Sequence, residues 1–457
     1  MEHLYLPLPE DDLGLFADLY ELTMAQAFFN REMFQPATFS LFIRNYPLNR
    51  GYLVAAGLQD VLDYLSNLSF SASSLDYLKS LGSFSDDFLK YLSNLKFTGS
   101  VRAIPEGRIF FANEPPLEVT APIIEAQLAE TFIVNQINLQ TLLATKAARC
   151  VWAAPGRTIS DFASRRTQGV DAALKMARCS YIGGFQSTSN VLAAKRYGIP
   201  PAGTMAHSFV SSFSTEIESF RAYAQAFPDR AILLLDTYDT ANGAQRAVTV
   251  AKEMESRGHR LLGVRLDSGD FDSLSRQVRR ILDGAGLDYV RIVASGGLDE
   301  FELETLSKTN APIDLYGVGT KAGVSADAPW SDMAYKLVCY DDRPVMKFSE
   351  DKISMPGPKQ VFRFRDGAGK FAEDVIGLQD ETVNGGEPLL TQIMAGGRLA
   401  VPHPTLAQLR ENFEQDFAKL DDKHKALVDP PKYLVSTSQG LERLTTQVRQ
   451  ESSSELP

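Results

Sequence analysis

Polar residues that could bind phosphate or a metal ion follow seven short apolar segments in the middle third of the chain. The segments are Thr158–Phe162, Cys179–Ile182, Ala202–Ala206, Ala231–Leu235, Leu261–Leu266, Val290–Ala294 and Asp314–Val318. The polar residues beyond them are, in order, Arg165–Arg166, Ser187–Ser189, His207–Ser208, Asp236 with Asp239, Asp267–Asp270, Ser295–Gly297 and Gly319–Lys321, and Arg265 stands inside the fifth segment. Arginine and lysine bind anionic oxygens, aspartate binds a metal ion or a ribose hydroxyl, and glycine turns at helix starts expose N–H groups to phosphate.

The elements that must position these residues alternate. Helical spacing fills the gaps between the apolar segments, at 165–178, 189–197, 215–227, 243–257, 271–283 and 299–309. Such alternation predicts parallel strands joined by right-handed crossovers. Seven units in a row favour an α/β fold with an irregular, TIM-like parallel barrel of about seven strands. Because barrel chemistry lies at the carboxyl ends of the strands, we expect the polar residues to converge on a phosphate-bearing, metal-assisted substrate.

The flanking thirds have a different pattern. In the first third, helical spacing covers 18–29, 52–66 and 74–94, and 99–120 is typical of short antiparallel strands and turns. In the last third we expect a hairpin over 335–348 that turns at Asp341–Asp342, a helix over 405–418 and a disordered tail, QESSSELP.

Composition indicates a folded protein of two or three domains: the chain has 457 residues, of which 44% are hydrophobic and 23% charged. The net charge of −11 argues against nucleic-acid or anionic-lipid surfaces. Three widely spaced cysteines, Cys150, Cys179 and Cys339, indicate free thiols in a reducing compartment. With an acidic N-terminal segment and no apolar run long enough for a membrane span, we expect a cytoplasmic protein. No GxxxxGK[ST] motif occurs, so a P-loop ATPase is not expected.

Several segments carry a family resemblance. GGFQSTSNVLAAKRYGIPPAGTMAHSFVSSFS (183–214) closely resembles the signature region of nicotinate phosphoribosyltransferases, which are type II phosphoribosyltransferases. The same holds, in the family's order, for DLYELTMAQAFF (18–29), RNYPLNRGYLVAAGL (44–58), SRRTQGVDAAL (164–174), LLDTYDT (234–240), GVRLDSGD (263–270), ASGGLDE (294–300) and GVGTKAGVS (317–325). The agreement covers roughly 15–350, and the last hundred residues are less diagnostic.

The resemblance implies a fold and an activity. The family has an irregular α/β barrel and a smaller domain built from both chain ends, so we expect 136–345 to form the barrel, with 1–135 and 346–457 forming the smaller domain. The family couples nicotinate to 5-phosphoribosyl 1-diphosphate in NAD biosynthesis, driven by ATP hydrolysis through a transient phosphohistidine. We therefore expect Mg²⁺, ATP as co-substrate, and a homodimer with each active site at the interface.

The resemblance also assigns roles to residues. His207 matches the phosphorylated histidine, and a neutral imidazole accepts phosphate near pH 7. Arg265 and Asp267 match substrate-holding residues, and the guanidinium could grip a carboxylate or phosphate as a planar fork. The alternative for the pair is a structural ion pair at a strand end.

Two aromatic residues are expected to enclose the substrate ring. By resemblance, Phe162 stacks on the pyridine ring, Tyr20 covers its other face across the dimer interface, and Arg165 faces substrate or phosphate. Ordinary core packing is the alternative for both rings. Ser189 stands where related nicotinamide-using enzymes have an aspartate, and the serine favours the carboxylic acid over the amide.

The remaining candidates contact phosphate, sugar or metal. Thr204 matches a nicotinate-contacting position, and Thr320 matches a position that contacts the sugar diphosphate. Gly296, Gly297 and Gly319 would allow close approach of backbone to phosphate, or form plain turns. Asp236 and Asp239, with Asp267, are candidates for Mg²⁺ binding or catalytic support, and solvated or helix-capping roles are the alternative.

Three other interpretations of the function remain open. One is a phosphoribosyltransferase for nicotinamide or quinolinate. Another is a non-catalytic paralogue that binds pyridine nucleotides, although His207, Arg265 and Asp267 are all present. The last is an unrelated phosphate-binding barrel such as an aldolase, which would need a Schiff-base lysine or a metal–histidine cluster.

Overall fold

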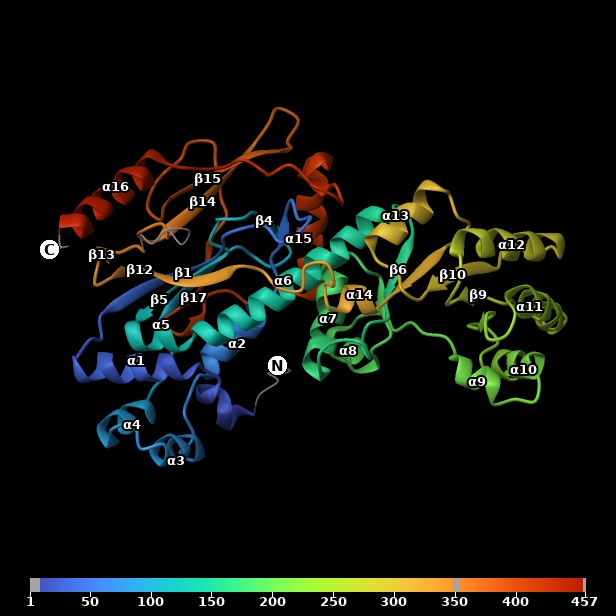
Figure 1. Ribbon diagram of the computed structural model, residues 1–457, viewed down its shortest axis with the longest axis horizontal. Coiled ribbons are helices and arrows are strands. Elements are labelled where there is room, and N and C mark those ends of the chain that lie inside the picture. The colour runs from blue at the N-terminus through green and yellow to red at the C-terminus, as the bar shows by residue number, and fades with distance from the viewer. Residues whose placement is uncertain (1–8, 348–353, 455–457) are drawn as a thin grey trace. The chain divides into compact units, whose positions relative to one another are not determined.

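The computed structural model describes residues 9–347 and 354–454 and divides the chain into two compact units. Unit 1 takes in Met1–Thr145 and Trp330–Pro457, and unit 2 takes in Lys146–Pro329. Figure 1 shows both units in one colour scale along the chain. Unit 1 is built from both chain ends and is the larger unit, whereas the resemblance implied that this part would be the smaller. The finer division at 1–135, 136–345 and 346–457 stays a prediction.

Unit 2 contains a parallel sheet of six strands. Its spatial order is β7–β6–β11–β10–β9–β8, with every neighbouring pair parallel. The strands are β6 (Thr158–Asp161), β7 (Ser187–Thr188), β8 (Ile232–Leu234), β9 (Gly263–Leu266), β10 (Arg291–Ser295) and β11 (Leu315–Val318). The helices between them are α7 (Val170–Ile182), α8 (Val191–Tyr197), α9 (His207–Ser211), α10 (Glu216–Ala226), α11 (Thr240–Glu255), α12 (Phe271–Gly284) and α13 (Glu300–Lys308), and α14 (Thr320–Gly323) follows β11.

The predicted alternation is confirmed in five of the seven strands, and two predicted strands are wrong. Cys179–Ile182 is the buried end of helix α7, because a short apolar run has the same pattern in a covered strand and in a buried helix. Ala202–Ala206 forms no strand. Pro200 and Pro201 precede it, and proline lacks the N–H that a ladder needs. Its link to the sheet is a bridge between Pro201 and Thr188 of β7.

The six-strand ladder is not closed by strand pairing among the described residues, so a complete seven-strand barrel is not seen. Residues 201–207 contact both ends of the ladder instead. Ala202 donates its N–H to the Thr188 carbonyl of β7 (2.9 Å), and the His207 imidazole forms a hydrogen bond with Thr237 just beyond β8 (3.0 Å).

Aspartates turn the chain from strand to helix on one side of this sheet. Asp239, Asp270 and Asp299 are the N-caps of α11, α12 and α13, and each side chain accepts a backbone N–H of the first helical turn. Such caps satisfy N–H groups that have no partner within the helix. They fix where each helix starts, directly after the loops that carry the predicted site residues.

The sheet of unit 1 is antiparallel and has seven strands. Its order is β13–β12–β1–β5–β3–β17–β18. One face packs against a large core that includes Phe39, Leu41, Val101 and Val119. The strands are β1 (Pro36–Ile43), β3 (Ser100–Ala103), β5 (Leu117–Pro122), β12 (Met333–Tyr340), β13 (Arg343–Pro344), β17 (Thr391–Ala395) and β18 (Arg398–Leu399).

Two smaller sheets and a set of helices complete unit 1. The sheets are β2 (Leu53–Val54) with β4 (Ile109–Phe110), and β14 (Lys359–Arg365), β15 (Phe371–Leu378), β16 (Glu387–Pro388) and β19 (Val435–Thr437). The α-helices are α1 (Leu19–Asn30), α2 (Leu58–Asn67), α3 (Ala72–Ser80), α4 (Asp86–Leu92), α5 (Ile123–Leu128), α6 (Glu130–Ala153, which continues into unit 2), α15 (Leu406–Lys419) and α16 (Gln439–Ser454). Two 3₁₀ helices are η1 (Glu10–Leu15) and η2 (Asp422–Lys425).

Most predicted elements of unit 1 are confirmed. The helices near 18–29 and 405–418 are α1 and α15, and β12 and β13 form the hairpin with Asp341 and Asp342 at positive φ (50° and 57°), as a two-residue turn requires. The helix over 52–66 starts only at Leu58, and the helix over 74–94 is broken into α3 and α4. Residues 450–454, expected to be disordered, belong to α16, and 455–457 lie outside the described residues.

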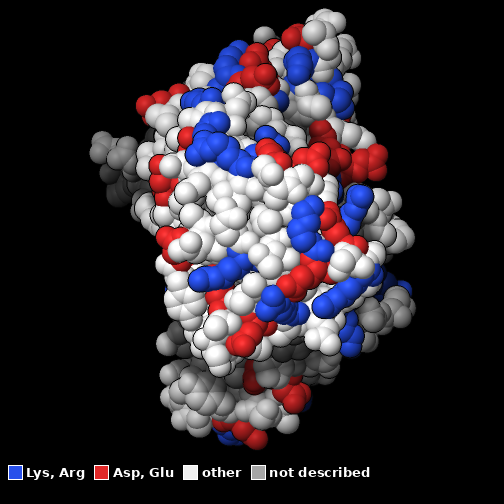
Figure 2. Space-filling model, turned by 90° about the vertical axis from the view of Figure 1, so that its right-hand side faces the viewer, with Lys and Arg blue, Asp and Glu red and all other residues white. Residues whose placement is uncertain are grey.

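The outer helices of unit 2 carry charges of both signs. Ion pairs join Arg221 to Glu253, Lys252 to Glu255, Arg276 to Asp272 and Arg279 to Asp283. Figure 2 faces this side of the molecule and shows Lys and Arg side chains interspersed with Asp and Glu. Over the described residues, no helix is long and apolar enough to cross a membrane.

Candidate active site

Arg265 stands at the centre of the candidate site, in the buried strand β9. A strand covered on both faces usually reads as an unbroken apolar run, and Arg265 interrupts one between Val264 and Leu266. Burial of a cation costs free energy unless hydrogen bonds replace water. The bonds are Nε to Ser295 Oγ (2.9 Å), Nη1 to Thr204 Oγ1 (2.6 Å), Nη1 to the Met205 carbonyl oxygen (3.0 Å) and Nη2 to Asp267 Oδ1 (2.9 Å).

These contacts decide how Arg265 can meet a ligand. A guanidinium has five N–H groups. Four are taken up by described residues, so one N–H on Nη2 remains. The planar fork expected to grip a carboxylate or phosphate is therefore used to join β9, β10 and residues 204–205. Arg265 offers a ligand its positive charge and one donor.

Asp267 lies directly beyond β9 and forms the ion pair with Arg265 that the sequence left open as an alternative. Ser295, at the end of β10, donates to the same carboxylate oxygen (2.5 Å). Burial raises the pKa of Asp267, but the Ser295 hydrogen bond and the Arg265 charge lower it more, so the pKa lies below its usual value. The carboxylate is thus kept ionised beside the cation.

His207 is the first residue of α9 and faces the same network. Its Nδ1 lies 3.0 Å from Thr237 Oγ1, and its Nε2 lies 3.7 Å from Asp267 Oδ2. The side chain is 43% exposed. The imidazole is therefore oriented from one edge and remains accessible to a ligand. The exposure distinguishes His207 from a histidine that is packed in the core.

A cavity of about 310 Å³ brings these residues together. Phe162 contributes a half-buried ring whose centroid lies 6.0 Å from Arg265 Cζ. The cavity contains one aromatic face, two guanidinium groups, an imidazole and a carboxylate, which suits a flat anionic ring and a phosphate. Its lining residues are Phe162, Ser164, Arg165, Ser189, Gly203, Thr204, Met205, Ala206, His207, Arg265 and Asp267.

The acidic candidates divide into two roles. Asp236 lies beyond β8, and its Oδ2 accepts the backbone N–H of Asp267 (3.0 Å) and the hydroxyl of Ser268 (2.5 Å). Its Oδ1 is buried without a hydrogen-bond partner among the described residues. Asp239 caps α11, which was the structural alternative. No group of three or more His, Cys, Asp or Glu that could hold a metal ion occurs in 9–347 or 354–454.

The glycine candidates shape the loops beside the cavity rather than line it. Gly296 has φ +99°, and a Cβ there would lie 2.0 Å from the Asp267 carbonyl oxygen, so no larger residue fits. Gly297 has φ +70°. Gly319 is the N-cap of the short helix α14, and Thr320 is exposed at its first position.

Tyr20 belongs to unit 1. It lies on α1 and is 46% exposed. Its expected contact with the substrate ring stays a prediction.

Sequence reasoning missed three residues of this network as site residues: Ser295, Thr237 and Ser268. Ser295 and Ser268 stand inside the polar runs singled out from the sequence, and Thr237 stands between Asp236 and Tyr238. Their position just beyond a predicted strand was therefore the one feature of the sequence that could have indicated them. Serine and threonine carry no charge that marks a site.

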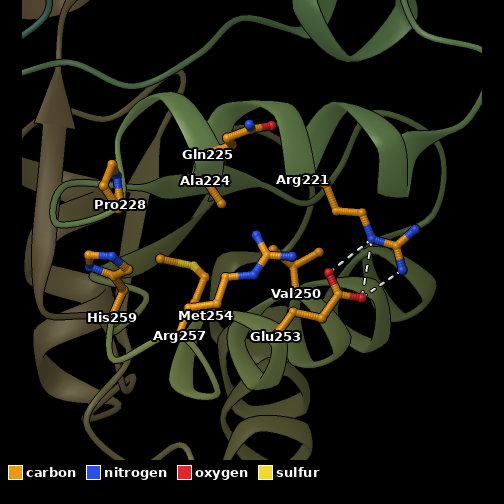
Figure 3. A pocket seen from close by; sticks show the side chains of 9 residues that line it. All are labelled: Arg221, Ala224, Gln225, Pro228, Val250, Glu253, Met254, Arg257 and His259. Atoms are coloured by element: carbon orange, nitrogen blue, oxygen red, sulfur yellow. Dashed lines mark hydrogen bonds and ion pairs between the residues drawn. The ribbon is translucent and has the colours of Figure 1, made fainter.

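A second pocket of unit 2, of about 590 Å³, lies between α10 and α11 (Figure 3). It contains none of the predicted site residues. The Arg221 guanidinium donates to the Glu253 carboxylate (N to O, 2.6 to 3.2 Å), as the dashed lines show. His259 Nδ1 lies 3.1 Å from Asp229 Oδ1. Its greater volume does not make it the candidate active site, because it lacks the predicted residues and its Arg221 and Glu253 are paired with each other.

Family models match most of the chain in three consecutive parts. The nicotinate phosphoribosyltransferase N-terminal domain matches 15–138, the family model itself matches 158–337, and the C-terminal domain matches 384–445. The chain belongs to the nicotinate phosphoribosyltransferase family. The family resemblance seen in the sequence is thus confirmed, and the C-terminal part is included.

Two curated members of this family are similar to this chain over nearly their whole length. Nicotinate phosphoribosyltransferase pncB2 of Mycobacterium tuberculosis is 48% identical over 91% of this chain and 89% of its own. The Bacillus subtilis nicotinate phosphoribosyltransferase is 37% identical over 94% of each chain.

Solved structures agree with the fold. The crystal structure of human nicotinic acid phosphoribosyltransferase matches with a TM-score of 0.87 and 29% identity, over 94% of this chain and 99% of that one. A nicotinate-nucleotide pyrophosphorylase from Pyrococcus furiosus has a TM-score of 0.74 at 24% identity, over 92% and 99% of the two chains, which shows a similar fold.

The hydrogen bond from Ser295 to Asp267 should make the stability of this protein depend on pH. Hydrogen bonds to charged groups contribute about 1.5–3 kcal/mol, against about 1 for neutral pairs. Asp267 has a lowered pKa, so its ionised form stabilises the fold above the unfolded pKa, near 4, and this contribution is lost as the pH falls through the lower folded pKa. We expect Ser295→Ala to destabilise by about 1–2 kcal/mol at pH 7 and by less toward pH 3.

The measurement is urea unfolding of wild type and Ser295→Ala between pH 3 and pH 7. Ser208→Ala, at an exposed serine, is the matched control and should stay within about 0.5 kcal/mol at every pH. A pH-independent gap between Ser295→Ala and wild type would contradict a bond to an ionised carboxylate.

Proposed function

We propose that this protein is an ATP-dependent nicotinate phosphoribosyltransferase that makes nicotinate mononucleotide and diphosphate from nicotinate and 5-phosphoribosyl 1-diphosphate in NAD biosynthesis. The observation that carries the proposal is the single cavity that holds Phe162, Arg265 and His207 in a chain of this family. The names of its relatives support the choice of substrates.

The proposed reaction needs no proton transfer. The lone pair of the nicotinate ring nitrogen forms a bond to C1 of the ribose, and the bond from C1 to the diphosphate oxygen breaks with its electron pair. Positive charge develops on the sugar and negative charge on the leaving group, so cations and N–H groups fixed near the diphosphate lower the barrier. Arg165 and Arg265 are the cations in the cavity wall.

Phe162 and Ser189 account for the choice of ring. Phe162 offers a flat apolar face to the pyridine ring. Ser189 lies in the wall as a neutral hydroxyl residue, so it does not repel a carboxylate. Thr204, whose hydroxyl accepts from Arg265, lies beside the same space and is assigned to contact nicotinate.

His207 is proposed to carry the phosphoryl group. An imidazole nitrogen attacks the γ-phosphorus of ATP, the bond to the bridging oxygen breaks, and ADP leaves; water later hydrolyses the phosphohistidine to phosphate. The Thr237 contact holds the ring, and its 43% exposure leaves room for the nucleotide. Phosphorylation would change the charge beside Asp267 and Arg265, and we propose that ATP use is coupled through this change to binding of the sugar diphosphate.

The residues present fit a magnesium ion that arrives with the sugar diphosphate. Mg²⁺ typically keeps several waters and uses one or two carboxylates together with substrate phosphates. Asp236, with its unpartnered Oδ1, and Asp267 are the carboxylates proposed to hold it; Asp239 already caps a helix. Bound Mg²⁺ would offset negative charge on the departing diphosphate. Gly296, Gly297, Gly319 and Thr320 are proposed to present backbone and hydroxyl groups to the phosphates.

The assembly and location complete the proposal. Leu19, Tyr20 and Met24 leave an apolar stripe of α1 exposed (60%, 46% and 36%), which supports a homodimer in which Tyr20 reaches the partner's substrate ring. Residues 201–207 would complete the barrel wall between β7 and β8. Three buried cysteines without disulfides support a cytoplasmic location.

Substrate choice is the direct test of the proposed function. Purified protein is given 5-phosphoribosyl 1-diphosphate with nicotinate, nicotinamide or quinolinate, with and without ATP, and the mononucleotide is detected by mass. We expect product from nicotinate, faster with ATP, and at least about 10-fold less from the other rings, since an unpaired charge or a lost ion contact costs more than about 1.4 kcal/mol. Equal turnover of nicotinamide would contradict the assigned specificity.

His207→Asn tests the phosphohistidine. Asparagine keeps a polar side chain of similar size but cannot accept a phosphoryl group, so nicotinate-dependent ATP hydrolysis should fall to background while slow ATP-independent synthesis remains. Phosphate release from ATP is the measurement, and His259→Asn, at a histidine of the α10–α11 pocket, is the control. Wild-type ATP turnover in His207→Asn would remove His207 from this role.

A further inference from the structure

Gly317 in β11 lies directly under the ring of Phe162. A Cβ at Gly317 would lie 2.5 and 2.6 Å from Cδ2 and Cε2 of Phe162, and 3.1 Å from Cβ of Ser295. Carbon atoms in contact stay about 3.5–4 Å apart. The ring therefore occupies the space that any side chain at position 317 would fill.

The strand register explains why the ring lies there. Gly317 pairs with Ser160 on β6 and with Ser295 on β10, and Ser160 pairs in turn with Ser187 on β7. Phe162 follows Ser160 by two residues, so both side chains leave the chain on the same side. Its ring leans from the end of β6 across small residues onto the backbone of β11.

The backbone of Phe162 lies against β11 and is tied to it by a hydrogen bond. Its N–H donates to the Val318 carbonyl oxygen (2.8 Å), and its own carbonyl oxygen would lie 2.7 Å from a Cβ at Gly319. A ring pushed by about 1 Å must therefore turn toward the cavity. On the cavity side lies Arg265, which four hydrogen bonds hold in place.

We propose that Gly317 is a positioning residue for the pyridine ring: the absence of a side chain sets the depth of the Phe162 ring, and with it the width of the slot between that ring and Arg265. This inference rests on the proposed function, because it takes Phe162 to be the stacking face for nicotinate. Gly317 itself acts only through Phe162.

Gly317→Ala is the test. Phe162 is half-buried, so its ring can shift into the cavity without unpacking the sheet, and the loss falls on nicotinate binding. A misplacement of 1 Å can cost about 100-fold. We expect the KM for nicotinate to rise at least about 10-fold, with the KM for 5-phosphoribosyl 1-diphosphate and the thermal midpoint close to wild type.

A double-mutant cycle separates positioning from a general packing defect. With Phe162→Ala as background there is no ring to push, so adding Gly317→Ala should change the KM for nicotinate by less than about 2-fold. Gly284→Ala, at a glycine with nothing within 4 Å of a Cβ, is the matched control for the added methyl group and should behave as wild type.

The outcomes distinguish this inference from the proposed function. Wild-type protein that does not convert nicotinate would refute the proposed function, and the role of Gly317 with it. Active wild type with an unchanged KM in Gly317→Ala, or with the same rise in KM in both backgrounds, would overturn the inference alone. A fall in the thermal midpoint with equal effects on both substrates would mean that Gly317 is needed for the fold and not for the slot.

Discussion

The arrangement of the site depends on one buried cation. Arg265 carries its charge into a strand that is otherwise apolar, and the free energy of that burial is offset because acceptors from three places converge on it: Ser295, residues 204–205 and Asp267. Two of these acceptors come from a segment that forms no strand. The guanidinium thus holds residues 204–205 where no backbone ladder does, and their position in turn leads the chain to His207.

The aspartates in the loops after β8, β9 and β10 have two roles. Asp236 and Asp267 face the network, where they accept hydrogen bonds from Asp267 N–H, Ser268, Ser295 and Arg265. Asp239, Asp270 and Asp299 lie a few residues further on and cap the next helices. Each loop is therefore fixed at both ends, which keeps short polar turns rigid enough to hold a phosphate-bearing substrate.

The sequence predicted structure best where a local pattern of residues determines the element. Apolar runs with turns on both sides predicted five of the six strands, and a cation inside such a run marked Arg265. Cys179–Ile182 failed because covered helices and covered strands share the same composition, and 202–206 failed because pairing with β7 stops at a single bridge of Pro201, directly before it. Ser295 and Gly317 could not be found this way. The role of Ser295 comes from a bond to a neighbouring strand, and the need for glycine at 317 comes from a ring on β6. The contact of Tyr20 with the substrate ring stays a prediction, because it was assigned from the resemblance alone.

We infer that the forked geometry of Arg265, and not its charge alone, holds the candidate cavity together. Calorimetric binding of nicotinate to Arg265→Lys tests it, with Arg291→Lys at the exposed start of β10 as control. Lysine keeps the charge but cannot reach acceptors in three directions from one plane, so affinity should fall by more than about 10-fold while the control binds as wild type. Wild-type affinity in Arg265→Lys would show that charge suffices and that the fork does not organise the site.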